Sequence, residues 1–228
     1  MGAINLTKQT VNLSKQQTIN LSKDYDAGLD EIQVGLGWDP AKPKPMGGIL
    51  GSIFGLTTKV PDIDCDAWVS IFDDNDKVLD TIYFNNLKYM YDGRVVIEHH
   101  GDNLTGVGAG DDEVITIHLH QLPANAKRLT IGVTIYRGFS RGQSFDIIEN
   151  VYIRLVDVKN NFEICRYADK NIYEYPRSQT FYAGDLINTS DGWQFRAIGV
   201  GDMSGSIGDA VKVAANANFS RVSGFGLK

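Results

Sequence analysis

Cysteine is scarce in this chain of 228 residues, where Cys65 and Cys165 are the only two and lie far apart. Two distant cysteines cannot form the disulfide framework of a small secreted domain, so we expect a reducing compartment. No run of about 18 apolar residues occurs, which argues against a transmembrane helix. The first ten residues, MGAINLTKQT, lack the basic and apolar regions of a secretory signal. The sequence therefore predicts a soluble, cytoplasmic protein.

Net positive charge is also missing. The chain carries 22 Lys and Arg against 28 Asp and Glu, a formal charge of −6. Phosphate binding needs a basic face, so we expect no nucleic-acid partner and no simple electrostatic docking onto anionic lipid. A chain of this length can bury a substantial core as one large all-β domain or two small domains.

Apolar and polar residues alternate along most of the chain, as is typical of half-buried β-strands. Ile32, Val34, Leu36 and Trp38, for example, alternate with polar residues and glycines. Turn clusters rich in Asp, Asn and Gly separate the segments. We expect strands at 31–38, 67–72, 78–84, 94–98, 114–119, 129–136, 151–158, 163–167, 180–187 and 193–200. Many short strands at near-regular spacing predict a sandwich or a barrel.

Three stretches depart from this pattern. INLTK, VNLSK and INLSK, which begin at Ile4, Val11 and Ile19, suggest short strands or a tail. Residues 40–61 form a long connection that is first rich in Pro and Lys, then in Gly and apolar residues, and 207–217 have the apolar spacing of a helix. We expect one domain over 1–228, with a strand or tail region at 1–30, a sandwich core at 31–201 and a C-terminal tail at 202–228.

Two clusters of oxygen-donor side chains give the strongest chemical signal. In DIDCD, the three Asp residues would share one face of a strand, where they repel one another unless a cation lies between them. In GDNLTGVGAGDDE, residues 101–113, glycines let the backbone fold back so that oxygens converge. Two Asn residues that end a strand can add amide oxygens. The candidate metal ligands are Asp62, Asp64, Asp66, Asn85, Asn86, Asp102, Asn103, Asp111, Asp112 and Glu113.

Carboxylate, amide and carbonyl oxygens are the ligands that calcium prefers. No thiolate or imidazole cluster accompanies these oxygen donors, which disfavours zinc and copper. Magnesium is an alternative to calcium, but it favours fewer protein ligands and more water. An EF-hand is excluded because the acidic turn 73–76 lacks the required Gly and distant Glu. From the residues alone, solvated turns explain the clusters equally well, because Asp, Asn and Gly are the usual turn formers.

Other reactive side chains favour ordinary structural roles. His118 and His120 lack an evident third ligand, so exposed strand histidines are favoured over a transition-metal site. Arg137, Arg141 and Arg154 are more often solvated or salt-bridged than anion-binding. No nucleophile–base pair or cofactor motif is present, so we expect that the chain is not an enzyme.

Several motifs occur in the order found in one known family. GLGWD at 35–39, FNNL at 84–87, HHGDNLTGVGAGDDE at 99–113 and WQFRAIGVG at 193–201 resemble the TerD family, over nearly all of 31–201. The resemblance implies an all-β fold, a two-sheet β-sandwich, here with a long loop insertion and a short C-terminal helix. It also implies calcium binding through the acidic loops, for which we expect two ions. Carried over by position, the ligands are Asp62, Asp64, Asn85, Asp102, Asp111, Asp112 and Glu113, supported by Asp66, Asn86 and Asn103.

The resemblance further implies a role in resistance to tellurite and other chemical stress. We therefore interpret the chain as a calcium-binding stress-response protein that acts as a binding or scaffolding module. Its expected partners are other stress-operon proteins at the inner face of the membrane. One alternative is a calcium-dependent membrane-surface module in the manner of C2 domains. Another is a small-molecule or carbohydrate-binding sandwich, which needs exposed aromatic residues such as Trp38, Trp68 or Tyr89 near the metal.

Overall fold

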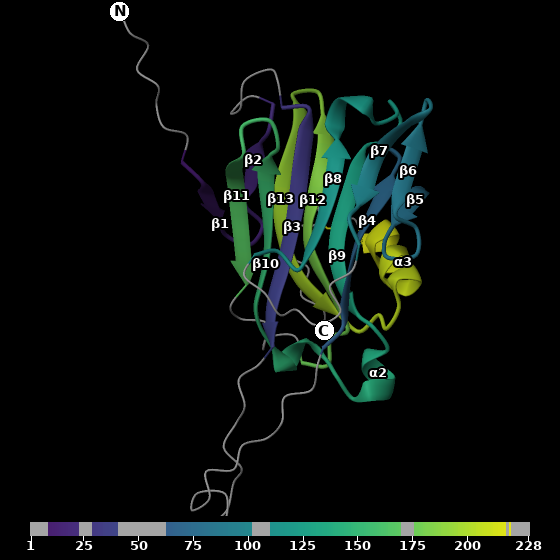
Figure 1. Ribbon diagram of the computed structural model, residues 1–228. Coiled ribbons are helices and arrows are strands. Elements are labelled where there is room, and N and C mark those ends of the chain that lie inside the picture. Colours follow the sequence, from purple (N-terminus) through teal and green to yellow (C-terminus); the bar gives the residue numbers. More distant parts are fainter. Residues whose placement is uncertain are drawn as a thin grey trace, which may run out of the picture.

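Two β-sheets stacked face to face form the body of the protein (Figure 1). The computed structural model describes residues 9–22, 29–40, 63–101, 110–169, 176–217 and 219. The seven-stranded sheet has the order β1 (Val11–Leu13), β11 (Phe162–Asp169), β10 (Ile148–Asp157), β3 (Glu31–Pro40), β8 (Glu113–His118), β7 (Arg94–His99) and β6 (Lys88–Tyr91). The six-stranded sheet has the order β2 (Thr18–Asn20), β13 (Gly192–Asp202), β12 (Thr180–Thr189), β9 (Arg128–Ile135), β4 (Cys65–Phe72) and β5 (Val78–Ile82).

Neighbouring strands run antiparallel, apart from β1, which pairs parallel with β11. Between the sheets lies the main apolar core, which alternate residues of the central strands enter, as the alternation predicts. On β3, Ile32, Val34 and Leu36 are fully buried. The sequence prediction of an all-β, two-sheet β-sandwich is therefore confirmed.

A second, smaller core covers the outer face of the six-stranded sheet. Helix α3 (Ile207–Ala217) lies against this face (Figure 1) and packs Ala210 and Val211 onto Trp68 and Tyr182. The indole and phenol rings meet edge to face, with centroids 5.9 Å apart. The helix occupies the range that apolar spacing predicts, so the expected short C-terminal helix is confirmed.

The described segments also contain a short helix α2 (Gly138–Arg141) and two 3-10 turns, η1 (Leu119–Gln121) and η2 (Phe145–Ile147). None of these helices is long and apolar enough to cross a membrane. The long loop insertion predicted over 40–61 and the end of the C-terminal tail lie outside the described residues.

Strand β6 (Lys88–Tyr91) is missing from the sequence prediction. Among the described strands it lies at an edge of the seven-stranded sheet and pairs only with β7. Three of its four residues are exposed. An edge strand exposed on both faces has no apolar–polar alternation, and so periodicity does not detect it.

The buried guanidinium of Arg128 links helix α3 to the six-stranded sheet. Arg128 donates to Asp76 Oδ1 at 2.9 Å, in the turn between β4 and β5, and to the backbone oxygen of Ala214 on α3 at 3.2 Å. Its Nη1 lies 3.9 Å from Oδ1 of Asp185, which is fully buried. The guanidinium also stacks 4.0 Å from the centre of the Phe72 ring. One cation thus balances two carboxylates and holds the helix end.

We expect Arg128→Met to lower the free energy of unfolding by about 3 kcal/mol, because it leaves the buried Asp185 carboxylate without this cation. Urea denaturation followed by circular dichroism measures the change. Lys88→Met is the matched control: Lys88 pairs with Glu98 at 2.8 Å, but the two side chains are 52% and 37% exposed. Such a surface pair contributes less than about 1 kcal/mol. Equal losses in the two variants would contradict a special role for Arg128.

Candidate functional site

The two acidic clusters of the sequence meet across the sandwich. Glu113 begins β8 in one sheet, and its Oε2 accepts a hydrogen bond from the backbone N–H of Ala67, on β4 of the other sheet, at 2.6 Å. The Glu113 side chain is 2% exposed, and Nε2 of His99 lies 3.3 Å from the same oxygen. This contact brings Glu113 next to the start of β4, which Asp64 and Asp66 flank.

The buried thiol of Cys65 lies within the electrostatic influence of several carboxylates. Burial raises the pKa of Cys65 well above its usual range, and the negative charges of Asp66, Glu113, Asp64 and Asp112 raise it further. Two of these acids belong to the β4 segment and two to the start of β8. Carboxylates from both predicted clusters therefore lie close enough to this thiol to influence its charge.

Asp112 is held at the edge of β3. Its N–H donates to the Leu36 carbonyl oxygen, and its Oδ2 accepts the N–H of Trp38, both at 2.8 Å. Burial raises the pKa of the Asp112 carboxyl, and the charges of Asp39 and Asp111 add to the rise, while the bond from Trp38 opposes it. An ionised Asp112 is therefore less stable here than in water.

Asp111, by contrast, has a strong cationic partner. Arg154 on β10 donates two hydrogen bonds to its carboxylate: Nε lies 2.8 Å from Oδ1, and Nη2 lies 2.8 Å from Oδ2. The Tyr152 hydroxyl donates to Oδ1 at 3.0 Å. Gly35 on β3 leaves room for this carboxylate, because a Cβ at that position would overlap its oxygens. A forked contact of this kind balances the charge of Asp111 within the protein.

The sequence predicts that Arg154 is solvated or salt-bridged, but it does not identify the partner. Arg154 lies in the polar phase of its strand, and nothing in the local pattern shows that Asp111, 43 residues away, faces it. The register of β10 on β3 makes the encounter, with Arg154 opposite Gly35. Nη1 of Arg154 also contacts Glu163 Oε2 at 3.1 Å, which extends the network to β11.

The remaining predicted ligands have different surroundings. Asp64 lies 3.5 Å from Nη1 of Arg141, and Asp66 is buried on β4. Asn86 uses its amide inside the turn after β5, where it donates to Asp80 Oδ1 at 3.1 Å and to the Thr81 carbonyl oxygen at 2.8 Å. Asn85 is exposed in the same turn.

Asp62, Asp102 and Asn103 lie outside the described residues, so the structure shows only part of the predicted ligand set. Within the described ranges, no three His, Cys, Asp or Glu side chains form a group arranged to hold a metal ion. The ligand assignment stays a prediction. The oxygen donors that are described nevertheless fit a hard cation, which carboxylates bind in preference to softer metals.

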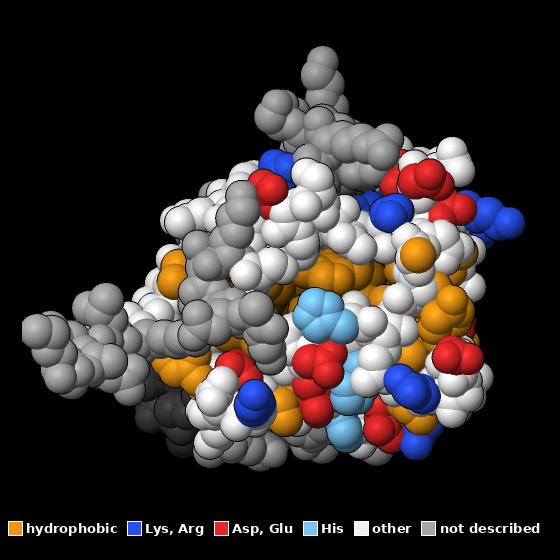
Figure 2. Space-filling model, turned by 90° about the horizontal axis from the view of Figure 1, so that it is seen from above, with side chains coloured by type: hydrophobic (Ala, Val, Ile, Leu, Met, Phe, Trp, Pro, Cys, Tyr) orange, Lys and Arg blue, Asp and Glu red, His pale blue; other side chains and the backbone are white. Residues whose placement is uncertain are grey.

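The histidines and aromatic residues of the sequence analysis lie elsewhere. His118 ends β8, with Nδ1 3.9 Å from Glu31. Figure 2 looks onto that end of the sandwich and shows histidine and acidic side chains side by side. Trp38 and Trp68 are 3% and 0% exposed, so neither offers the exposed ring that a carbohydrate site beside the metal would need.

Comparison with known proteins agrees with the fold. The TerD domain family matches residues 9–212. The stress response protein SCP2 of Bacillus subtilis (strain 168) is 39% identical over 194 residues, which cover 84% of this chain and 92% of that protein. The tellurium resistance protein TerZ of Serratia marcescens is 41% identical over 189 residues, covering 83% and 89%. A crystal structure of a TerD homologue from Streptomyces coelicolor A3(2) superposes with a TM-score of 0.55 at 20% identity, covering 78% and 92%.

We expect the Asp112 carboxyl to titrate above the usual pKa of an aspartate in the calcium-free protein, because burial and two neighbouring carboxylates disfavour its charge. Asp209 is an internal reference: its bonds from Lys212 and Ser206 lower its pKa. Carboxyl-carbon chemical shifts followed against pH give both midpoints in one experiment. An Asp112 midpoint at or below that of Asp209 would contradict the electrostatics described above.

Proposed function

Because the chain belongs to the TerD domain family, we propose that it is a calcium-binding stress-response protein of the cytoplasm. In this proposal it acts as a binding or scaffolding module in resistance to tellurite and other chemical stress, and it catalyses no reaction. The names of its relatives support the stress role, since they include tellurium resistance and stress response proteins.

One observation carries the calcium part of the proposal: the Glu113–Ala67 hydrogen bond brings two clusters of carboxylates together across the sandwich. Partly buried carboxylates that share a small space repel one another and lose hydration. A divalent cation between them offsets both costs. The raised pKa of Asp112, of which burial is the largest cause, is consistent with this loss of hydration.

The described residues that would hold the ion differ in availability. Asp64 and Asp112 are partly buried, and the printed contacts of their carboxylates are with the exposed Arg141 and with the N–H of Trp38. Glu113 is already bonded to Ala67, and His99 lies against it, so His99 would orient a ligating Glu113. The carboxylate of Asp111 is balanced by Arg154, so its most direct contribution is to fix the start of β8. Calcium takes six to eight oxygens, and the predicted ligands of 102–103 would add to this set.

An ion at this place would couple metal binding to the stability of the sandwich. Its ligands come from β4 in one sheet and from β8 in the other. Calcium that binds only the folded state stabilises it by about 2.7 kcal/mol when the free ion is about a hundredfold above the dissociation constant. Rigid loops at this end would then present a fixed surface to partners. We propose other stress-operon proteins at the inner face of the membrane as those partners.

Calorimetric titration of calcium into chelator-treated protein tests the site. We expect the double variant Asp64→Asn, Asp112→Asn to lose at least about tenfold in affinity, because two hard anionic ligands become neutral amides. Excess magnesium should compete weakly, since it prefers a smaller site with more water.

Asp92→Asn is the matched control for that titration. Asp92 is exposed in the turn between β6 and β7 with φ 48°, a conformation that Asn also adopts readily. It should bind calcium like the parent chain. An unchanged affinity in the double variant would remove Asp64 and Asp112 from the site, and the absence of binding in the parent chain would end the calcium proposal.

Asp112→Asn should have opposite effects with and without calcium. Its folded pKa is raised, so its contribution to stability is present below the unfolded pKa and is lost as pH rises through the folded pKa. In chelator at pH 7, we therefore expect the variant to melt above the parent chain, with the difference shrinking toward pH 4. In saturating calcium, the parent chain should melt higher. The same order in both conditions, followed by thermal circular dichroism, would refute this role.

A further inference from the structure

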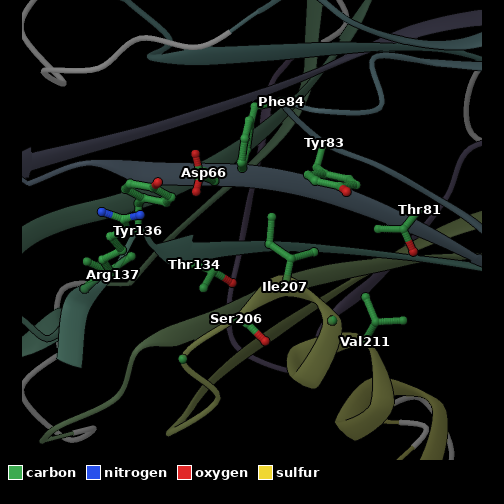
Figure 3. A pocket seen from close by; sticks show the side chains of 13 residues that line it. Asp66, Thr81, Tyr83, Phe84, Thr134, Tyr136, Arg137, Ser206, Ile207 and Val211 are labelled. Atoms are coloured by element: carbon green, nitrogen blue, oxygen red, sulfur yellow. The ribbon is translucent and has the colours of Figure 1, made fainter. Parts of the chain in front are cut away.

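A pocket of about 560 Å³ lies at the beginning of helix α3, on the outer side of the six-stranded sheet. Its floor comes from β4 and β9, one wall from β5 and the turn after it, and the opposite wall from Gly205–Val211 (Figure 3). Of the predicted metal ligands that the structure describes, Asp66 alone lines it. A pocket of this size accommodates a small organic molecule.

Aromatic rings form one wall of this pocket. Phe84 meets Tyr83 edge to face with centroids 5.3 Å apart, and it meets Tyr136 in the same way at 6.3 Å. The Phe84 side chain is 40% exposed, although it is large and apolar. Ile207 and Val211 supply aliphatic surface from the helix side. The pocket therefore suits a ligand with an apolar body.

A buried carboxylate lies among these rings. Asp66 is 5% exposed, and its neighbours Cys65 and Ala67 are in the core between the sheets. Because side chains alternate along a strand, Asp66 points to the opposite face of β4, where the pocket lies. In Figure 3, its carboxylate is seen between the rings of Phe84 and Tyr136. Carboxylates and aromatic faces both attract cations.

Arg137, the basic residue that lines the pocket, does not reverse the preference of the pocket for a cation. Arg137 is exposed, so water and salt screen its charge, whereas Asp66 acts from a buried position. Its guanidinium stacks 5.2 Å from the centre of the Tyr136 ring, and that of Arg141 lies 5.4 Å from the same centre. The chain's own cations thus already use this ring as a cation–π partner.

We propose that this pocket binds an organic ammonium group carried on an apolar body. Asp66 supplies the opposite charge, Phe84 supplies the aromatic face, and Ile207 and Val211 contact the apolar part. The pocket is separate from the proposed calcium ligands Asp64 and Asp112, and its occupancy does not require the metal.

Benzyltrimethylammonium is a suitable probe, with phenylacetate and benzyl alcohol as its anionic and neutral counterparts. In calcium-free protein, titration followed by methyl and aromatic NMR should shift signals of Ile207, Val211 and Phe84 with the ammonium compound. We expect its affinity to exceed that of either counterpart by about tenfold, the difference made by a charge pair and a cation–π contact. Tighter binding of phenylacetate, with its loss in Arg137→Gln, would overturn the proposal in favour of an anion site.

Two isosteric variants on the same segment separate this site from the metal. Asp66→Asn should weaken benzyltrimethylammonium about tenfold and leave benzyl alcohol unchanged, while Asp64→Asn should leave both unchanged and weaken calcium. If Asp66→Asn instead abolishes calcium binding and calcium displaces the probe, Asp66 is a metal ligand and the ammonium site is wrong. If the probe binds as expected but calcium does not bind at all, the calcium proposal fails and this one stands.

Discussion

The hydrogen bond from Ala67 to the buried Glu113 carboxylate is the contact on which the chemistry of the molecule depends. It crosses from one sheet to the other at the place where β4 and β8 begin. A carboxylate with 2% exposure is costly unless hydrogen bonds or cations stabilise it. This bond fixes Glu113 in the interior and, with it, the position of Asp112 beside the β4 segment.

Around this bond, the structure divides the acidic residues by the partner that each one meets. Asp111 faces the guanidinium of Arg154, and Asn86 is bound within its own turn. Asp66 lies on the face of β4 that carries helix α3, in a pocket lined by aromatic rings. Asp64 contacts the Arg141 guanidinium, and Asp112 accepts the N–H of Trp38. The predicted ligands of the two clusters therefore occupy several chemically different positions.

Strand β4 connects the two proposed sites and keeps them separate. Asp64 and Asp66 are two residues apart, yet one contacts Arg141 and the other lines the pocket beside α3. Burial of Trp68 and Phe72 under the helix fixes the orientation of this strand, because a shift by one residue would turn both rings into the main core. The same packing that holds α3 therefore turns Asp66 toward the pocket.

The sequence by itself determined the fold class, ten of the thirteen strands that the described residues form, the C-terminal helix and the family, because each depends on local alternation, helical spacing or contiguous motifs. The sequence did not predict strand β6, because apolar and polar residues do not alternate in this exposed strand. Only the tertiary structure decided that Arg154 grips Asp111, that Glu113 bonds to Ala67 and that Asp66 lines a pocket. Arg154 and Asp111 are 43 residues apart in the sequence, and Glu113 and Ala67 are 46 residues apart. Asp66 and the other residues that line the pocket come from different elements. All of these partners meet only through strand register and the stacking of sheets. Local sequence carries no record of those distances, since register is set by the packing of the whole core.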